Sequence, residues 1–423
     1  MSKSEKDPFV FPIARSPASN VSVLRRLSLL LTEFRNIFSL LTSSARRRRI
    51  VFYSEDAATW TQLEGYVRPL IEKHGESVVY ITSDVNDPLL ERPPPNLDPI
   101  YVDRLLGTLI PQLEAGVLVM TMPDLGSFHV QPPGPKTLTV YVFHSLNSVH
   151  ASYRPCAFDH YDAFFCTGPH HREELTAALQ KQGQSVPRLF DVGYPKLDRM
   201  HADHAAFRDR SSSGEGRGTG PGTRTILVAP SWGPGNLLEA GGVQLLKALR
   251  GTGHSIILRP HPCFLLPIYP KGPEILAEIE ASCRSDDGFS IDTDFTSEKS
   301  FHRGDLLVSG WSGAASEYAF ATERPVLFID VPRKVFNPDW ERLGRPTFED
   351  LVRSRVGRII RLDEFDKIPE AVEEMLGAPE AYRNQIRAMR QESIYNMGEG
   401  GANGARIILD LLAERGWETP MPG

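Results

Sequence analysis

Residues 255–262 read Ser-Ile-Ile-Leu-Arg-Pro-His-Pro, an apolar run that ends in an arginine, a histidine and two prolines. The run is short, rich in isoleucine and bounded by turn-forming residues, which is typical of a buried β-strand. A helical pattern follows at residues 274–283. Because a buried strand followed by a helix is the repeating unit of a parallel sheet, this stretch predicts an α/β fold.

The same alternation continues on both sides of this stretch. In the second half of the chain, the pattern predicts strands at residues 225–229, 306–309 and 325–329, and helices at residues 243–249, 314–321, 364–376, 380–395 and 402–415. In the first half it predicts strands at residues 50–54, 78–82, 117–121, 136–143, 163–166 and 188–192, helices at residues 59–74, 102–113 and 170–181, and a proline-rich loop at residues 92–99. Two such series predict two Rossmann-like, doubly wound parallel sheets that face each other.

Composition marks the boundaries between these series. Residues 211–223 (SSSGEGRGTGPGT) are rich in glycine and serine, which predicts a flexible linker. We therefore expect a first domain at residues 50–210 and a second domain at residues 224–398. An N-terminal extension precedes them at residues 1–49, and a closing segment follows at residues 399–423.

Charge and cysteine content exclude several classes of protein. The 423 residues include 47 Lys+Arg and 53 Asp+Glu, a net charge of −6, so the chain lacks the broad basic surface of a nucleic-acid binder. The four cysteines lie too far apart for a zinc site, and we expect buried thiols in a reducing compartment. No leader and no run of eighteen apolar residues is visible, which predicts a cytoplasmic protein with no membrane span.

The N-terminal extension contains a helical pattern at residues 21–45. Its apolar side chains recur at steps of three and four residues: Leu24, Leu27, Leu31, Phe34, Phe38 and Leu41. Its basic side chains are Arg25, Arg26 and Arg35, and the cluster Arg46, Arg47, Arg48 and Arg49 follows. A basic amphipathic helix suits the surface of an anionic membrane. The stripe suits equally a helix that packs on its own domain.

Polar or glycine-containing clusters follow five of the expected strands. They are His144-Ser145, Gly193-Tyr194-Pro195-Lys196, Pro230-Ser231-Trp232-Gly233, Arg259-Pro260-His261-Pro262 and Ser309-Gly310-Trp311-Ser312-Gly313. Glycine and proline after a strand are ordinary turn formers. Ligands of doubly wound sheets, however, bind beyond the carboxyl ends of the strands. Five clusters at that edge predict a shared binding cleft.

The cluster at residues 309–313 precedes a helix, and the start of a helix binds phosphate through its free N–H groups. Ser309, Ser312 and Gly313 are therefore candidate diphosphate contacts, and Glu317 could accept from a ribose hydroxyl. The alternative for Ser312 is ordinary N-capping. A nucleophile elbow at residues 310–314 is excluded because no histidine follows Ser312 in the chain.

Three basic side chains complete the candidate site. Arg259 offers a fork for phosphate oxygens, and His261 could donate a hydrogen bond or a proton to a leaving phosphate. His144 could take the proton of an acceptor hydroxyl. Each also has a structural alternative: a surface arginine, a capping histidine and a histidine that stabilises the end of a strand. No P-loop, zinc-protease motif or Asp-x-Asp pair occurs, so we expect neither a cofactor nor a metal.

Several of these clusters occur in the order found in a known family. From about Val140 to Leu412 the chain resembles the CDP-glycerol glycerophosphotransferases, the polymerases and primases of teichoic acids. The matching segments are Phe143-His144-Ser145, Gly193-Tyr194-Pro195-Lys196-Leu197-Asp198, Ala229-Pro230-Ser231-Trp232, Arg259-Pro260-His261-Pro262, Gly310-Trp311-Ser312-Gly313 with Glu317, and residues 399–407. Gly310, Ser145 and Lys196 stand where the family has Asp, Gly and Arg.

The resemblance implies a GT-B fold, in which two Rossmann-like domains face a central cleft and the last helix crosses back onto the first domain. It implies transfer of glycerol phosphate from CDP-glycerol, or a similar donor, to a hydroxyl of a membrane-linked glycan or lipid on the inner face of the cell membrane. The donor contacts would be Arg259, Ser309, Ser312, Gly313, Glu317 and Ser231; His144 would be the base, and His261 would assist the leaving group. Related alternatives are a glycosyltransferase that uses a CMP- or UDP-sugar and an enzyme like the nucleotide-sugar 2-epimerases. A non-catalytic binding protein is a further alternative.

Overall fold

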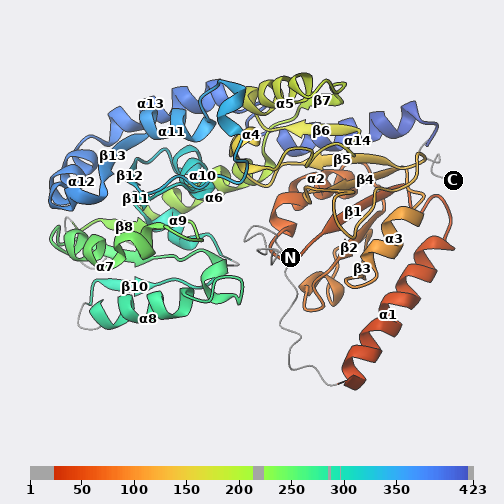
Figure 1. Ribbon diagram of the computed structural model, residues 1–423, viewed down its shortest axis with the longest axis horizontal. Coiled ribbons are helices and arrows are strands. Elements are labelled where there is room, and N and C mark those ends of the chain that lie inside the picture. The colour runs from red at the N-terminus through yellow and green to blue at the C-terminus, as the bar shows by residue number, and fades with distance from the viewer. Residues whose placement is uncertain (1–22, 213–222, 284–286, 296, 418–423) are drawn as a thin grey trace, which may run out of the picture.

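The computed structural model describes residues 23–212, 223–283, 287–295 and 297–417. It contains two parallel sheets that lie side by side along the long axis of the molecule (Figure 1). The predicted α/β architecture with two doubly wound sheets is therefore confirmed.

The first sheet has seven strands in the order β3-β2-β1-β4-β5-β6-β7. The strands are β1 (Ile50–Ser54), β2 (Val78–Thr82), β3 (Leu97–Tyr101), β4 (Val117–Met120), β5 (Leu138–Val142), β6 (Ala163–Cys166) and β7 (Arg188–Asp191). The helices are α2 (Trp60–Glu72), α3 (Leu106–Gln112), α4 (Val149–Ser152) and α5 (Pro169–Lys181). Val51 and Tyr53 of β1 enter one apolar core, while Ile50 and Phe52 enter another. Both faces of the sheet are covered, which explains why its strands read as continuous apolar runs.

The second sheet has six strands in the order β10-β9-β8-β11-β12-β13. The strands are β8 (Thr225–Val228), β9 (Ser255–Leu258), β10 (Phe289–Ile291), β11 (Leu306–Ser309), β12 (Val326–Asp330) and β13 (Gly357–Arg361). The helices are α7 (Leu237–Arg250), α8 (Gly272–Cys283), α9 (Lys299–Arg303), α10 (Gly313–Thr322), α11 (Phe348–Arg355), α12 (Ile368–Gly377) and α13 (Pro379–Ser393). The central strands β8, β9, β11 and β12 match the strands predicted from apolar runs.

Three strands that the sequence did not predict lie at the edges of the sheets. β3, β10 and β13 each pair with a single neighbour. Edge strands need fewer apolar residues, and they tolerate proline because one side of the strand has no pairing partner. Pro99 lies in β3, so the proline-rich loop expected at residues 92–99 was wrong for its last three residues.

Two helices connect the domains. α6 (Pro195–Ser212) packs on α2 of the first domain and on α10 of the second. It was not predicted because its sequence is strongly polar, and its last two residues belong to the segment expected as linker. Residues 213–222 of that segment lie outside the described residues. α14 (Gly400–Glu414) packs on α2, and its Ile408 and Leu412 enter the core of the first domain.

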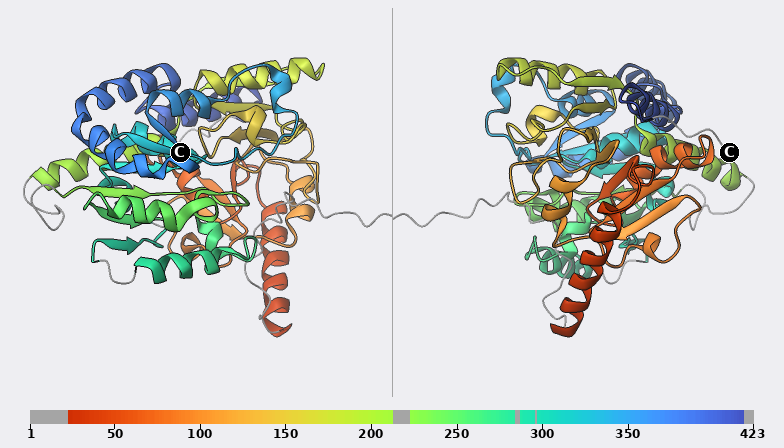
Figure 2. Two further views of the ribbon diagram at one scale, coloured as in Figure 1. Left: turned by 60° about the vertical axis from the view of Figure 1, so that its left-hand side comes forward. Right: turned by 90° about the vertical axis from the view of Figure 1, so that its right-hand side faces the viewer.

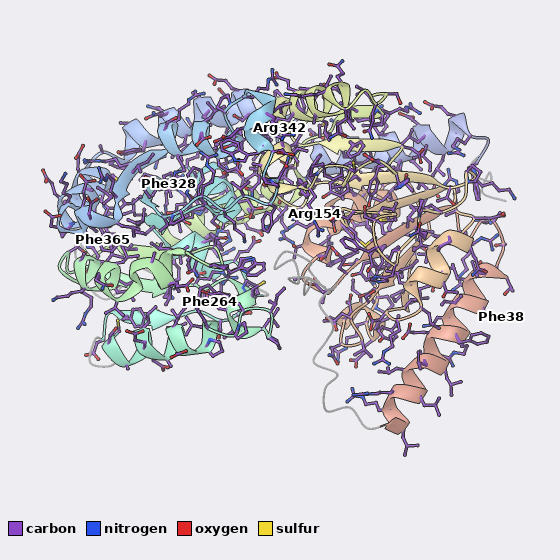
Figure 3. All side chains as sticks on the ribbon, viewed as in Figure 1. Phe38, Arg154, Phe264, Phe328, Arg342 and Phe365 are labelled. Carbon is purple, nitrogen blue, oxygen red and sulfur yellow. The ribbon has the colours of Figure 1, made fainter. Side chains whose placement is uncertain are left out.

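Helix α1 (Val23–Leu41) extends from the first domain (Figures 1 and 2). It is attached by a narrow face in which Glu33, Ile37 and Leu40 are buried. Glu33 accepts hydrogen bonds from the backbone N–H groups of Asp103 and Leu105, at 3.1 and 2.9 Å. Five of the six side chains of the predicted apolar stripe face solvent, with exposed fractions of 80, 56, 62, 65 and 62% for Leu24, Leu27, Leu31, Phe34 and Phe38. The sixth, Leu41, packs against the core of the first domain. Phe38 points away from the domain in Figure 3.

The arginine cluster at the end of α1 holds this helix to the domain. Arg47 pairs with Asp98 at 2.7 Å, and Arg49 pairs with Glu76. Arg48 donates to the backbone oxygens of Leu41 and Ser43, near the carboxyl end of the helix. Among the helices described, none is both long enough and apolar enough to cross a bilayer.

Candidate functional site

Two loops from different domains meet at the boundary between the sheets. One follows β5 and carries His144; the other follows β11 and begins α10 at Gly313. A Cβ placed on Gly313 would lie 3.0 Å from Oδ1 of Asn147 and 3.5 Å from Cβ of Ser145. The two loops therefore touch here, and a larger residue at position 313 would require the Asn147 side chain to shift.

His144 lies at the start of the first of these loops, with a ring that reaches solvent. A ring N–H donates to the backbone oxygen of Thr121. Partial desolvation by the residues packed around the ring, together with the positive charge of Lys196, nevertheless lowers the pKa of His144 below its ordinary 6.5. A pKa below 6.5 leaves the imidazole largely neutral at pH 7, in the form that can accept a proton.

Two further histidines fix the loop that carries His144. His171 is fully buried; its Nε2 lies 3.1 Å from the backbone oxygen of Asn147, and its ring contacts Phe143. His170 lies 3.0 Å from the backbone oxygen of Leu146 and stacks on Phe348 of the second domain. Both histidines lie on α5, and the sequence predicts that such a pair at a helix start caps the helix or lies in solvent. That prediction was wrong, because both rings bond backbone oxygens of the loop instead.

Glu317 connects the two domains through its carboxylate. The side chain is 8% exposed. Its Oε1 accepts from the hydroxyl of Tyr194 and its Oε2 accepts from Nζ of Lys196, each at 2.7 Å. The hydroxyl of Tyr194 also lies 3.0 Å from the backbone oxygen of His144. Tyr194 thus links the acidic residue of α10 to the backbone at His144.

Gly193 and Asp198, which flank this pair, organise the segment before α14. Gly193 has a φ of 107°, and a Cβ on it would lie 2.5 Å from the backbone oxygen of Tyr395, so glycine is required there. The carboxylate of Asp198 accepts from the backbone N–H groups of Gly398 and Gly400, at 2.7 and 3.0 Å. Burial raises the pKa of Asp198 to about 6 despite these bonds. The motif at residues 193–198 therefore joins α6, α10 and α14.

Arg259 is engaged within its own domain. Its Nη1 lies 2.6 Å from Oδ2 of Asp292, 3.0 Å from the backbone oxygen of Asp294 and 3.2 Å from Oγ of Ser300. The guanidinium also lies 5.3 Å from the ring centre of Phe301. In this arrangement Arg259 orders the loop after β10, and phosphate would have to compete with Asp292 for it.

The start of α10 borders a small cavity on its second-domain side. Ser312 occupies the N-cap position, but its side chain makes no capping hydrogen bond, so the capping alternative was wrong for its hydroxyl. Ser309 is fully buried and donates to the backbone oxygen of Ala229 at 2.7 Å, which ties β11 to β8. Trp311, Ser312 and the buried Arg353 line a cavity of about 10 Å³ beside the helix, enough for about one water molecule.

His261 and Ser231 lie with Lys334 at the carboxyl edge of the second sheet. The Nδ1 of His261 accepts from the backbone N–H of Cys263 at 3.2 Å, so a neutral ring carries its proton on Nε2. Burial and the charge of Lys334 lower the pKa of His261 to about 3. Nζ of Lys334 lies 3.4 Å from Oγ of Ser231 and 4.3 Å from the ring centre of Trp232. His261 is therefore a neutral donor beside a lysine that the sequence analysis did not single out.

Solved structures similar to this chain share its architecture. The teichoic acid polymerase TagF matches with a TM-score of 0.58 at 14% identity, over 93% of this chain and 99% of that chain. A TagF variant soaked with CDPG matches with a TM-score of 0.59 at 14% identity, over 94% of this chain and 100% of that chain. A putative UDP-N-acetylglucosamine 2-epimerase from Listeria monocytogenes matches with a TM-score of 0.55 at 14% identity, over 89% of this chain and 98% of that chain. The chain has a GT-B fold.

The predicted GT-B fold class is thereby confirmed. No family model matches the sequence, and no curated protein matches it. At identities of 14% the structural likeness establishes the fold but not the donor or the acceptor, which depend on the side chains of the site.

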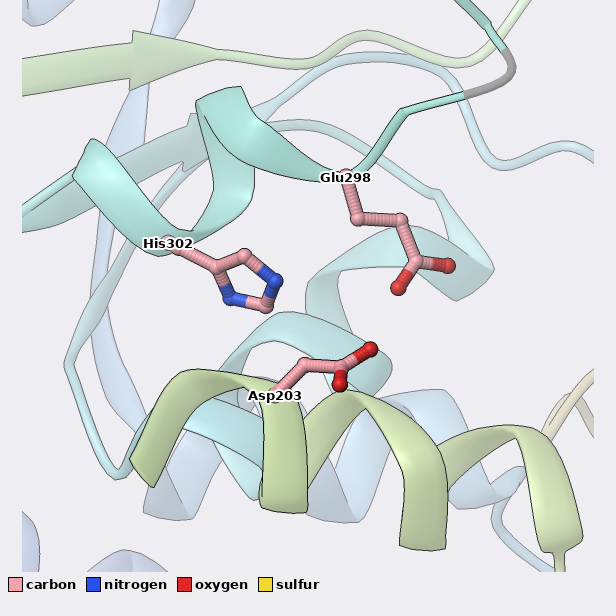
Figure 4. Close-up of side chains that lie close together, drawn as sticks. All are labelled: Asp203, Glu298 and His302. Carbon is pink, nitrogen blue, oxygen red and sulfur yellow. The ribbon is translucent and has the colours of Figure 1, made fainter. Parts of the chain in front are cut away.

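A group of three side chains on α6 and at the start of α9 could hold a metal ion, although the sequence predicted none. Ligand atoms of Asp203 on α6, Glu298 before α9 and His302 on α9 lie within 4.8 Å of one another (Figure 4). Glu298 also pairs with Arg199 at 3.3 Å, and Asp203 is exposed. The positive charge of Arg199 already balances part of the cluster, so the expectation of metal-independent activity is left to experiment.

A further carboxylate follows β1 of the first domain. Burial and the neighbouring charge of Asp56 raise the pKa of Glu55 to about 7. Glu55 was not predicted from the sequence, because a single acidic residue after a strand matches no known motif.

Proposed function

We propose that the protein transfers glycerol phosphate, or a related polyol phosphate, from a CDP-linked donor to a hydroxyl of a membrane-linked glycan or lipid in cell-surface polymer synthesis. The observation that carries the proposal is the contact between the loop of His144 and the start of α10 at Gly313. It brings the loop that carries a neutral imidazole in one domain to a helix N-terminus of the other, and a helix N-terminus suits a diphosphate. The similarity to TagF in fold supports the same proposal.

In the proposed reaction, the acceptor oxygen attacks the phosphorus that carries the polyol, and its proton passes to His144. A new oxygen–phosphorus bond forms, the bond from that phosphorus to the bridging oxygen of the diphosphate breaks, and CMP leaves with the electron pair. The N–H groups at the start of α10 and Nε2–H of His261 would stabilise the charge on CMP. The protein forms no covalent bond to the transferred group in this reaction. Its contribution to the rate is therefore the positioning of the reactants and the electrostatic stabilisation of the transition state.

Ser309, also expected to contact the donor, is fully buried with its hydroxyl bonded to Ala229 and offers no contact in this arrangement. Two charged residues could contact the donor only if their present interactions allow it. Glu317 would contact ribose only by accepting an additional hydrogen bond, which a carboxylate can do because its oxygens have further lone pairs. Arg259 would contact phosphate only by sharing its guanidinium with Asp292. Ser312 makes no capping hydrogen bond, so its hydroxyl is available to the donor without breaking one.

A thermal-shift panel tests the class of donor. CDP-glycerol, CDP-ribitol and CMP are expected to raise the melting temperature, while UDP-sugars leave it unchanged. Stabilisation by UDP-sugars alone would overturn the proposal in favour of a UDP-dependent glycosyltransferase or an epimerase-like enzyme, and stabilisation by CMP-sugars but not CDP-glycerol would favour a sialyl-type transferase.

The exposed stripe of α1 is proposed to hold the protein on an anionic membrane surface. The stripe leaves five large apolar side chains in solvent, with Arg25, Arg26 and Arg35 on the same helix. Replacing Leu27, Phe34 and Phe38 with serine is expected to abolish binding to vesicles that contain anionic lipid, because that binding scales with the apolar area inserted. Wild-type binding is expected to weaken as salt rises, because the arginines contribute by Coulomb attraction.

The control replaces an apolar side chain of the second domain that is also exposed. Leu351 is 45% exposed on α11, and Leu351→Ser should leave vesicle binding unchanged. Equal binding of the triple α1 variant and the wild type in a flotation assay would contradict the membrane role of α1.

Turnover is expected to survive exhaustive chelation. A helix N-terminus and the second-domain cations can neutralise the diphosphate without a metal. The measurement is the rate of CMP release before and after dialysis against EDTA. The opposite outcome is a rate that is lost on dialysis, returns when a divalent ion is added, and does not return in a Glu298→Gln variant. That outcome would show that the cluster of Asp203, Glu298 and His302 binds a required metal.

A further inference from the structure

Lys334 is a part-buried lysine whose ammonium group has no carboxylate partner among the described residues. Its Nζ makes one long hydrogen bond, 3.4 Å, to Oγ of Ser231, and lies over the rings of Trp232 and Phe336, at 4.3 and 5.1 Å from their centres. An ammonium group carries three protons that can be donated. Aromatic faces attract a cation but do not accept its hydrogen bonds as a charged oxygen does.

Other lysines of the protein are paired differently. Their ammonium groups lie within 2.6–2.8 Å of a glutamate, in the pairs Lys136–Glu114, Lys196–Glu317, Lys271–Glu239 and Lys367–Glu364. Taking an unpaired ammonium group out of water is costly. Burial accordingly lowers the pKa of Lys334 to about 8. An anionic ligand would supply the charge that this group lacks.

The surroundings of Lys334 identify the kind of anion. Ser231 follows β8, His261 follows β9 and Lys334 follows β12, so three loops converge at the carboxyl edge of the second sheet. Hydroxyl, imidazole N–H and ammonium groups are donors that suit phosphate oxygens. Among the described residues, the three loops supply no carboxylate that pairs with Lys334. Besides burial, the positive charge of Lys334 lowers the pKa of His261.

The segment that carries Lys334 also reaches the first domain. The backbone N–H of Phe336 donates to the backbone oxygen of Ala151 at 3.0 Å, and Nδ2 of Asn337 donates to the backbone oxygen of His150 at 2.8 Å. Ala151 and His150 lie on α4, a few residues after His144. Lys334 therefore lies on the side of the second domain that faces the loop of the proposed base.

We propose that Lys334, with Ser231 and His261, forms the subsite for the diphosphate of the nucleotide donor. This inference rests on the proposed function for the identity of the donor, but not for the binding of a diphosphate group. It assigns to Lys334 the electrostatic role that the sequence predicted for Arg259, which the structure pairs with Asp292. Contact with phosphate would replace one weak hydrogen bond by charge-assisted ones.

The test measures binding by calorimetry with pyrophosphate, CDP and cytidine as probes. Lys334→Met is expected to weaken binding of pyrophosphate and CDP by about tenfold or more, the usual worth of a hydrogen bond to a charged group, and to leave cytidine unchanged. Lys334→Arg should retain most of the affinity because it keeps the charge. Lys271→Met, which removes an exposed lysine paired with Glu239, is the matched control and should change nothing.

A second measurement on the unmodified protein covers the case in which Lys334→Met does not fold. Pyrophosphate is expected to slow acetylation of Lys334 by at least about fivefold and to leave Lys271 unaffected, as read by peptide mass spectrometry. Unchanged acetylation of Lys334, or pyrophosphate binding by a folded Lys334→Met within twofold of wild type, would overturn the inference. The two proposals can also fail separately. If Lys334→Met binds pyrophosphate weakly but the wild type binds UDP and not CDP, the inference about Lys334 stands and the proposed cytidine donor is overturned.

Discussion

Replacing His144 with alanine is expected to lower turnover by about a hundredfold or more while the affinity for donor nucleotide stays nearly unchanged. The imidazole lies in the first domain, whereas the proposed donor contacts lie in the second, so its loss removes the base without removing a donor contact. The defect should shrink as pH rises because hydroxide increasingly replaces the missing base. The measurement is a donor titration together with the rate of CMP release.

The pH profile adds a second readout for His144. Burial and Lys196 lower its pKa, so the wild-type rate should fall only below pH 6.5, as the imidazole becomes protonated. This acid limb should be missing in His144→Ala. His74→Ala, at an exposed histidine of the first domain, is the control and should keep the wild-type profile. A His144→Ala variant with normal donor binding and more than about a tenth of wild-type turnover would show that this histidine is structural.

Replacing Glu317 with glutamine is expected to destabilise the protein by about 2–3 kcal/mol, because the ammonium group of Lys196 then stays largely buried without its counter-charge. A change of this size should lower the melting temperature by about 5 °C or more for domains of this length. Turnover should fall as well, since Glu317 and Tyr194 link α10 to the backbone at His144.

A double variant separates the charge effect from a loss of packing. Glu317→Leu combined with Lys196→Met removes both charges, and it should recover most of the lost stability if the orphaned ammonium group is the cause. Glu414→Gln breaks the exposed pair with Arg188 and should leave the melting temperature unchanged. An unchanged melting temperature in Glu317→Gln would contradict the proposed role of this residue in joining the domains.

The sequence was sufficient for the central strands and insufficient for the edges. Strands such as β1 and β9 are buried on both faces, so they read as apolar runs whatever surrounds them. β3 and β13 are paired on one side only and carry Pro99 and arginines, which no local pattern distinguishes from a loop. α6 was missed because Leu197 and Met200 near its start enter an apolar core, while most of its later side chains are polar and give no helical apolar stripe.

The candidate site shows the same limit for side chains. The position of Arg259 after a strand was correct, but its partner Asp292 comes 33 residues later in the chain, and no spacing rule connects the two. The phosphate contact predicted for Arg259 therefore remains a prediction, in competition with an ion pair. Lys334 was missed for the opposite reason: its neighbours come from three separate loops that only the folded sheet brings together.

The central claim is transfer of a polyol phosphate from a cytidine diphosphate donor, and the most direct measurement follows that group. Purified protein is incubated with CDP-glycerol labelled in its glycerol, together with vesicles that carry a polyprenyl-linked glycan. The account predicts release of CMP in equal amount to the label that enters the lipid fraction, with both absent for His144→Ala. Consumption of a UDP- or CMP-sugar under the same conditions, with no label transferred from CDP-glycerol, would contradict it.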